Sequence, residues 1–230
     1  EMVLAGGHSA IERKARVELK QEERAARFSE PDPAVREAYL ARHYPAYWLK
    51  VELDRQEQHA RFLHAAEAAG RTTATRVETD RFRGVTELTI LAPDHPRLLA
   101  IVTGACAAAG GNIVDAQIFT TSDGLVLDTI FVSRAFERDD DELRRAERIA
   151  AAIERALKGE IKIADLVAQR RAPPPRGQTF QVAPEVVIDN VLSTRHTVIE
   201  VSGLDRPGLL YDLTTAISKL NLNIASAHVS

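Results

Sequence analysis

The chain has 230 residues, a formal net charge of −3 and 45% hydrophobic residues, which allows one or two domains with a buried core. The slight acidity gives no electrostatic reason to expect a nucleic acid or an anionic membrane as partner. The single cysteine, Cys106, excludes an intramolecular disulfide and a cysteine-rich zinc site. No apolar run approaches the roughly 20 residues of a membrane span, and no signal-peptide layout is present. We therefore expect a cytoplasmic protein without membrane or nucleic-acid partners.

The first part of the chain, 1–70, is predicted to be helical. Capping patterns and prolines delimit helices over 9–28, over 33–44 and over about 54–70. The aromatic segment 44–49 lies between two of these helices. It is interpreted either as an interaction surface or as packing between helices, and packing is preferred.

From residue 72 the pattern changes to strands and helices of an α+β domain. The order strand, helix, strand, strand, helix lacks one strand of a ferredoxin-like βαββαβ unit. After a short helix at 163–168 and a proline-rich linker, the segment 180–193 is expected to supply that missing strand. The expected elements before it are strands 72–80 and 85–92, a helix from Asp94 to Gly110, strands 112–121 and 125–133, and an acidic-start helix from 139.

The stretch 91–118, the first copy, recurs without a gap as 202–229, the second copy. We therefore expect one complete βαββαβ domain over 72–192 and the first βαβ part of a second, incomplete domain over 193–230. Residues 196–230 are expected to be ordered only if they dock onto the first domain or another chain. The identical pairs are Asp94/Asp205, Pro96/Pro207, Leu98/Leu209, Leu99/Leu210, Thr103/Thr214, Ala105/Ala216, Asn112/Asn223, Ile113/Ile224 and Ala116/Ala227.

A turn of the pattern Asp-x-Pro joins strand to helix in both copies, at 94–96 and 205–207. Aspartate here is expected to accept hydrogen bonds from the first free helix N–H groups. The remaining N–H groups and the helix dipole then form a small anion site suited to a carboxylate. Asn112 and Asn223 begin the next strand, and their amides are expected near the same turn, where they suit an α-amino-acid headgroup. The alternative is that these residues are only caps and turn formers.

The chain resembles the ACT domain, a regulatory module that commonly binds amino acids, in the strings DHPRLL…GGNI and DRPGLL…LNI. The resemblance extends to the C-terminal region of one enzyme family through HYPAYWL, FRGVTEL, NIVDAQIFTT, DGLVLDTIF, EVVIDN and TVIEVSGLDRPGLLYDLT. This family comprises the bifunctional uridylyltransferases/uridylyl-removing enzymes that act on the PII nitrogen-signalling protein.

The resemblance implies a nucleotidyltransferase domain, an HD phosphohydrolase domain and two ACT domains. It implies glutamine as the effector, which suppresses uridylylation of PII and promotes removal of uridylyl groups, and magnesium and UTP as requirements of the parent enzyme. Residues 1–70 would connect the hydrolase to the sensors. The motifs of catalysis are absent from this chain, which is expected to be non-catalytic and without a cofactor, with catalysis upstream of Glu1. Its seven histidines are scattered and predict no metal site.

The resemblance fails at one position, because the ACT turn usually has glycine after the proline. The second copy has Gly208 there and the first copy has Arg97. We therefore expect the second copy to be the better preformed site, since Gly208 lets the backbone either turn closely or take a positive φ. His95 and Arg206 are expected to face solvent. The candidate ligand-binding residues are Asp94, His95, Pro96, Arg97, Leu98, Asn112, Ile113, Asp205, Arg206, Pro207, Gly208, Leu209, Asn223 and Ile224.

Two other functions are alternatives to an amino-acid-sensing part of an enzyme. One is a stand-alone ACT-type amino-acid-binding or oligomerisation protein. Another is RNA recognition, which needs exposed aromatics on central strands, where only Phe119 and Phe131 are available. Cys106 is interpreted as an inert core residue and the acidic run 139–141 as a solvated helix start. ACT units are expected to pair through their sheets, within or between chains.

Overall fold

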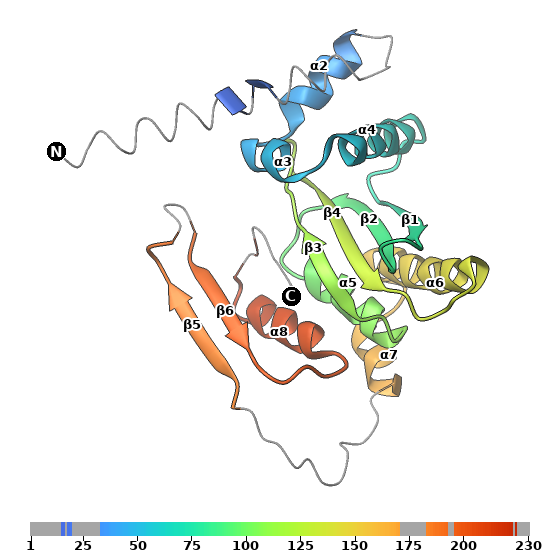
Figure 1. Ribbon diagram of the computed structural model, residues 1–230, viewed down its shortest axis with the longest axis vertical. Coiled ribbons are helices and arrows are strands. Elements are labelled where there is room, and N and C mark those ends of the chain that lie inside the picture. Colours follow the sequence, from blue (N-terminus) through green and yellow to red (C-terminus); the bar gives the residue numbers. More distant parts are fainter. Residues whose placement is uncertain are drawn as a thin grey trace, which may run out of the picture. The chain divides into compact units, whose positions relative to one another are not determined.

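The computed structural model describes residues 15–16, 18–19, 33–170, 183–192, 196–222 and 224. Most of the predicted helix 9–28, the proline-rich linker and Asn223 lie outside them. The described helices (Figure 1) are α2 Pro33–Arg42, α3 Pro45–Lys50, α4 Leu53–Ala68, α5 Leu98–Ala108, α6 Asp139–Leu157, α7 Ile163–Arg170 and α8 Leu209–Lys219. The strands are β1 Ala74–Asp80, β2 Val85–Pro93, β3 Ile113–Gln117, β4 Leu125–Ser133, β5 Glu185–Asp189 and β6 Val198–Ser202.

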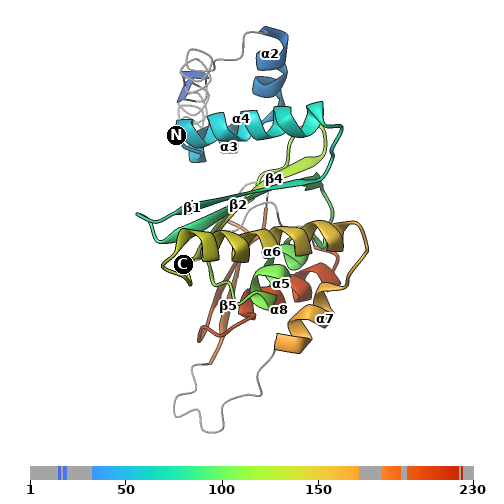
Figure 2. The ribbon, with the colours of Figure 1, turned by 90° about the vertical axis from the view of Figure 1, so that its right-hand side faces the viewer.

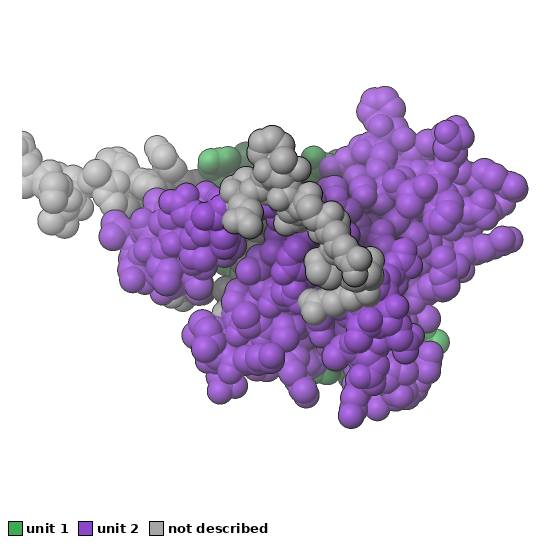
Figure 3. Space-filling model, turned by 90° about the horizontal axis from the view of Figure 1, so that it is seen from below, with its two compact units in different colours: residues 1–76, 89–94, 117–129 green, residues 77–88, 95–116, 130–230 purple. Residues whose placement is uncertain are grey.

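The chain folds into two compact units, coloured separately in Figure 3. Unit 1 contains residues 1–76, 89–94 and 117–129, and unit 2 contains residues 77–88, 95–116 and 130–230. The first is built largely from the helical segment and the second from the two copies. The α+β class expected from the sequence is confirmed.

The strands form a four-stranded sheet in the order β1-β2-β4-β3 and a separate pair β5-β6. The expectation that β5 completes the first sheet is therefore wrong. The edge beside β2, which the last strand of a βαββαβ unit would occupy, is taken by β1. The turn over 81–84 joins β1 directly to β2, so this pairing closes a short loop, whereas β5 would have to return across a much longer segment.

The β5–β6 pair is an antiparallel hairpin that opens the second copy, as β1–β2 opens the first. The first strand of each hairpin ends on an aspartate whose carboxylate accepts backbone N–H groups of the turn. Asp80 Oδ1 accepts from Arg83 N at 2.9 Å, and Asp189 Oδ1 accepts from Val191 N at 2.6 Å and Leu192 N at 2.8 Å. The repeated pattern in the described residues is thus strand, strand, helix, and it begins earlier than the sequence identity indicates.

Unit 1 is held together by an aromatic cluster from α2, α3 and α4, so the packing interpretation of segment 44–49 is correct. Tyr47 and Trp48 are almost fully buried. A chain of hydrogen bonds crosses the cluster, from the Tyr39 hydroxyl to the Tyr47 hydroxyl at 2.7 Å and from there to His59 Nδ1 at 3.0 Å. His59 Nε2 then meets Thr129 Oγ1 of β4 at 3.1 Å. The two tyrosine hydroxyls, His59 and Thr129 therefore satisfy one another in the core, whereas both ring nitrogens of the neighbouring His43 have no partner in the described structure.

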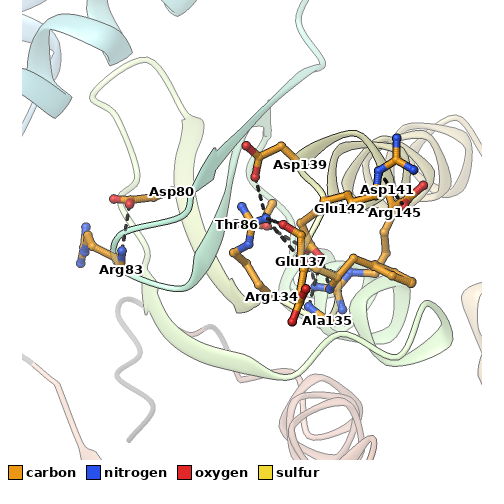
Figure 4. Close-up of polar contacts among 12 residues, drawn as sticks. Asp80, Arg83, Thr86, Arg134, Ala135, Glu137, Asp139, Asp141, Glu142 and Arg145 are labelled. Atoms are coloured by element: carbon orange, nitrogen blue, oxygen red, sulfur yellow. Dashed lines mark hydrogen bonds and ion pairs between the residues drawn. The ribbon is translucent and has the colours of Figure 1, made fainter.

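Unit 2 places α5 and α6 side by side on one face of the strands (Figure 2). A buried ion pair anchors α6, with Arg145 Nη2 2.7 Å from Glu142 Oε1 (Figure 4). Glu142 also accepts from the Thr86 hydroxyl at 2.8 Å and from Ala135 N at 3.0 Å. Burial alone would raise the pKa of Glu142, but these hydrogen bonds and the Arg145 charge keep that pKa below its ordinary value. The start of α6 is thereby fixed to the strands.

Candidate functional site

The two copies meet in unit 2 through their helices. Thr103 Oγ1 of α5 lies 2.9 Å from Thr214 Oγ1 of α8, and these two residues occupy equivalent positions in the two copies. A Cβ built on Gly208, at the start of α8, would lie 4.0 Å from the Cβ of Ala107, near the end of α5. The helices therefore run antiparallel about the threonine pair, so the beginning of α8 lies beside the end of α5.

The turn of the first copy begins α5 without help from Asp94. The N-cap residue is Arg97, with φ −98°, and the Arg97 N–H donates to His95 Nδ1 at 3.1 Å. Among the described residues, no helix N–H donates to the Asp94 carboxylate, so the expected aspartate cap is wrong. The half-buried His95, expected to face solvent, satisfies this N–H because its ring nitrogen reaches the backbone two residues ahead. Asp94 belongs to unit 1, where its backbone N–H donates to Gly124 O at 3.1 Å.

The turn of the second copy is built differently. Gly208 is the N-cap of α8 with φ +79°, the left-handed conformation that glycine adopts without steric cost. Of the two roles expected for Gly208, the positive φ is the one that the structure shows. Arg206 donates to Asp212 Oδ2 at 2.7 Å, so the Arg206 side chain lies over the first turn of α8. Asp205 is exposed, and among the described residues no helix N–H donates to its carboxylate.

Both turns leave helix N–H groups available for an anion. In α8, Leu209 N donates to Arg206 O and Asp212 N donates to Gly208 O, each at 3.0 Å. Between them, the N–H groups of Leu210 and Tyr211 have no acceptor among the residues that the structure describes. The first turn of α5 has the same arrangement at Leu99 and Ala100, after Leu98 N has bonded His95 O. Free N–H groups at the positive end of a helix dipole attract carboxylates.

Asn112 does not lie near the turn of its own copy. Helix α5 has 11 residues and separates the Leu98 end from the Asn112 end by roughly 16 Å. The expectation that one turn and the asparagine of the same copy form a site is therefore wrong. Because α5 and α8 are antiparallel, the end of α5 that leads to Asn112 lies beside the α8 turn instead. The Asn112 side chain is exposed, and its backbone carbonyl accepts from Ser133 N at 2.8 Å.

The remaining candidates are apolar or outside the described residues. Leu98 and Ile113 are buried and hold the ends of α5 in the core, while Leu209 and Ile224 are half-buried. Pro96 and Pro207 are exposed turn residues. Asn223 lies outside the described residues, so its position relative to the first-copy turn is still a prediction.

The α8 turn places two opposite partial charges side by side. The beginning of α8 offers N–H donors, and the end of α5 beside it carries the negative end of a helix dipole. Burial raises the pKa of the Cys106 thiol to about 12, so the nearby cysteine is an inert thiol. Within the described ranges, no group of three or more His, Cys, Asp or Glu side chains is placed to hold a metal ion.

Sequence reasoning missed three buried ionisable groups in unit 1. Burial lowers the pKa of His43 and of His59 to about 3, so both imidazoles are neutral. Burial raises the pKa of Asp128 to about 8, and its Oδ2 has no hydrogen-bond partner in the described structure. The sequence signal for a buried carboxyl is that Asp128 interrupts the largely apolar run of β4, whose inner residues are all buried. Phe119 and Phe131 are buried too, so neither is an exposed stacking platform.

Comparison with known proteins identifies the class first: the chain carries an ACT domain, matched over residues 86–153 and 197–230. Over its full length it is similar to the bifunctional uridylyltransferase/uridylyl-removing enzymes of Rhodopseudomonas palustris, at 58% identity over 232 residues, and of Nitrobacter hamburgensis and Bradyrhizobium diazoefficiens, at 57% over 230 residues. The resemblance inferred from the sequence is thereby confirmed. The chain spans about 25% of the length of each relative. Among the described helices, none is long and apolar enough to cross a bilayer.

Proposed function

We propose that this chain is an amino-acid-sensing regulatory region, and that its site lies where the α8 turn meets the end of α5. The observation that carries the proposal is the antiparallel contact of the two helices, with Gly208 beside Ala107. The α-carboxylate of an amino acid would accept from the free N–H groups of Leu210 and Tyr211. Its ammonium would face the negative end of α5 and the exposed Asn112 amide.

The effector we propose is glutamine, in an enzyme that uridylylates and deuridylylates PII. The support is the chain's full-length similarity to enzymes named for both activities and the ACT domain that it carries. In this proposal the parent enzyme is cytoplasmic and uses magnesium and UTP in domains outside this chain. Glutamine would bind one arrangement of the two copies more tightly than another and so bias the catalytic domains.

A second candidate is an ACT-type amino-acid-binding protein without an attached enzyme. It shares the site but predicts no effect of the ligand on uridylylation. Comparing PII uridylylation by a protein with the full length of the relatives, with and without glutamine, separates the two functions.

Calorimetric titration of the chain with glutamine tests the site. We expect saturable binding of glutamine, and we expect Asn112→Ala to raise the dissociation constant about tenfold, the cost of one lost hydrogen bond to a charged group. Asn190→Ala is the matched control, because Asn190 lies in the exposed turn after β5. Absence of binding, or equal affinity of the Asn112 and Asn190 variants, overturns the proposed site.

A further inference from the structure

Helix α7 lies outside the residues that the ACT family matches, yet it packs against α5 of the first copy. Its buried residues are Ile163 and Val167. Ile163, the first residue of α7, contacts Gly104. Arg170, the last residue of α7, contacts Gly110, just beyond the end of α5. The two helices therefore run in the same direction, so the last residue of α7 reaches the same end of α5 as the α8 turn does.

The Arg170 guanidinium rests on the backbone of Gly110. A Cβ at Gly110 would overlap Nη2 and lie 3.0 Å from Cζ, so a side chain at this position would displace the guanidinium. Gly110 also has φ +70°, which favours glycine independently. The Arg170 side chain is exposed, and within the described ranges no carboxylate forms an ion pair with it. The guanidinium thus lies against Gly110, and the part of the chain that the structure describes supplies no counter-ion for it.

Three groups of complementary chemistry converge at this end of α5. Gly208 with the free N–H groups of α8 lies beside Ala107, three residues before Gly110. Asn112 follows Gly110 by two residues. The planar guanidinium of Arg170 adds two parallel N–H donors, the geometry that binds a carboxylate in a bidentate manner.

We propose that Arg170 is a ligand-binding residue, supplied by α7, that pairs with the α-carboxylate of the amino acid at the α8 turn. This inference rests on the proposed function, since it names the residue that selects a carboxylate at that site. The competing role is structural: an arginine at the end of α5 offsets the helix dipole and carries no ligand. In that role, replacing Arg170 would lower the stability of the fold and would change the affinities for all ligands by the same factor.

The test uses two ligands that differ only at the carboxylate: L-glutamine and L-glutaminamide, in which a neutral amide replaces the α-carboxylate. The chain, Arg170→Ala and Arg170→Lys are titrated with both by calorimetry, and their thermal unfolding is recorded. We expect Arg170→Ala to weaken glutamine binding at least tenfold and to keep the affinity for glutaminamide within twofold of the wild-type value. The glutamine affinity of Arg170→Lys should lie between those of the wild type and Arg170→Ala, because lysine keeps the positive charge but loses the two parallel N–H donors. Arg148→Ala, an exposed arginine of α6, is the matched control and should match the wild type.

Each result decides between the roles. Equal losses for both ligands, with a lower unfolding temperature, assign Arg170 a structural role and overturn this inference alone. Unchanged glutamine binding by Arg170→Ala overturns it as well and leaves the proposed function standing. A wild-type chain that binds neither ligand overturns both.

Discussion

The two copies begin their helices with the same Asp-x-Pro pattern and in two different conformations. In the first copy Arg97 caps α5 with φ −98° and its N–H bonds the ring of His95. In the second copy Gly208 caps α8 with φ +79°, and Arg206 folds back to Asp212. The residue after the proline decides which conformation forms, because a left-handed backbone costs an arginine and not a glycine.

The helices that follow also differ at equivalent positions. Gly104 of α5 corresponds to Thr215 of α8, and only Gly104 has close neighbours that exclude a side chain. The interface between the copies is therefore asymmetric around the symmetric pair Thr103 and Thr214. The shared Asp-x-Pro pattern thus allows two turn conformations, and both leave helix N–H groups without an acceptor among the described residues.

The largest expected effect is a pH dependence of the unfolding free energy that unit 1 shows and the second copy does not. His43 and His59 have folded pKa values of about 3 against ordinary values of 6.5, so the unfolded chain binds more protons below pH 6.5 and stability falls there. Asp128, at about 8 against 3.8, acts oppositely: its contribution is complete below pH 3.8 and is lost as pH rises toward 8. Two groups against one leave a net loss of about 1.4 kcal/mol per pH unit below 6.5. Unit 1 should be most stable near pH 6.5.

Chemical unfolding followed by the fluorescence of Trp48, the single tryptophan, measures this profile. We expect a loss of about 3 kcal/mol between pH 6.5 and 4.5. Asp128→Asn should double the acid slope and abolish the loss above pH 6.5. Hydrogen exchange should show no matching loss of backbone amide protection in α8, where no buried histidine or aspartate is described. A flat fluorescence profile would contradict the burial of these groups.

Filling the close contact between the copies should cost less. Gly104→Val places a side chain against Ile163 and the Tyr211 ring, whose Cδ2 lies 2.8 Å from the position of a Cβ. We expect a loss of about 2 kcal/mol in unfolding free energy, from overpacking. Thr215→Val is the matched control, because its buried hydroxyl has no partner in the described structure and its loss is neutral or stabilising. Equal changes in unfolding free energy for the two variants would show that the interface accepts a valine equally well at the two equivalent positions.

The smallest effect tests the two turns directly. Gly208→Ala adds a Cβ that meets only Ala107 at 4.0 Å, so its expected cost of about 1 kcal/mol is conformational. Arg97→Gly should cost less than about 1 kcal/mol, through the added entropy of the unfolded chain. Urea titration of both variants measures the difference. A larger loss from Arg97→Gly than from Gly208→Ala would mean that the turns do not differ as described.

Much of the fold followed from local pattern. The strand Leu125–Ser133 and the acidic start of α6 agree with the sequence prediction, because a tight turn and acidic residues in a first helical turn act on near neighbours. Helix α5 ends before Gly110, as predicted. The failures concern partners. The predicted Asp94 cap is wrong, because the backbone N–H of Arg97 donates to His95 instead. The predicted pairing of β5 with the first sheet is wrong, because β1 occupies that edge.

The sequence by itself determined the duplication, the α+β class and the ACT identity, since these depend on residue order and periodicity. Only the tertiary structure decided which parts meet. It set the two helices antiparallel, with Gly208 of the α8 turn beside Ala107, and it brought Arg170 of α7 against Gly110 at the same end of α5. These are contacts between segments distant in the chain. Their geometry depends on how helices pack around Gly104 and the threonine pair, and no local pattern encodes that.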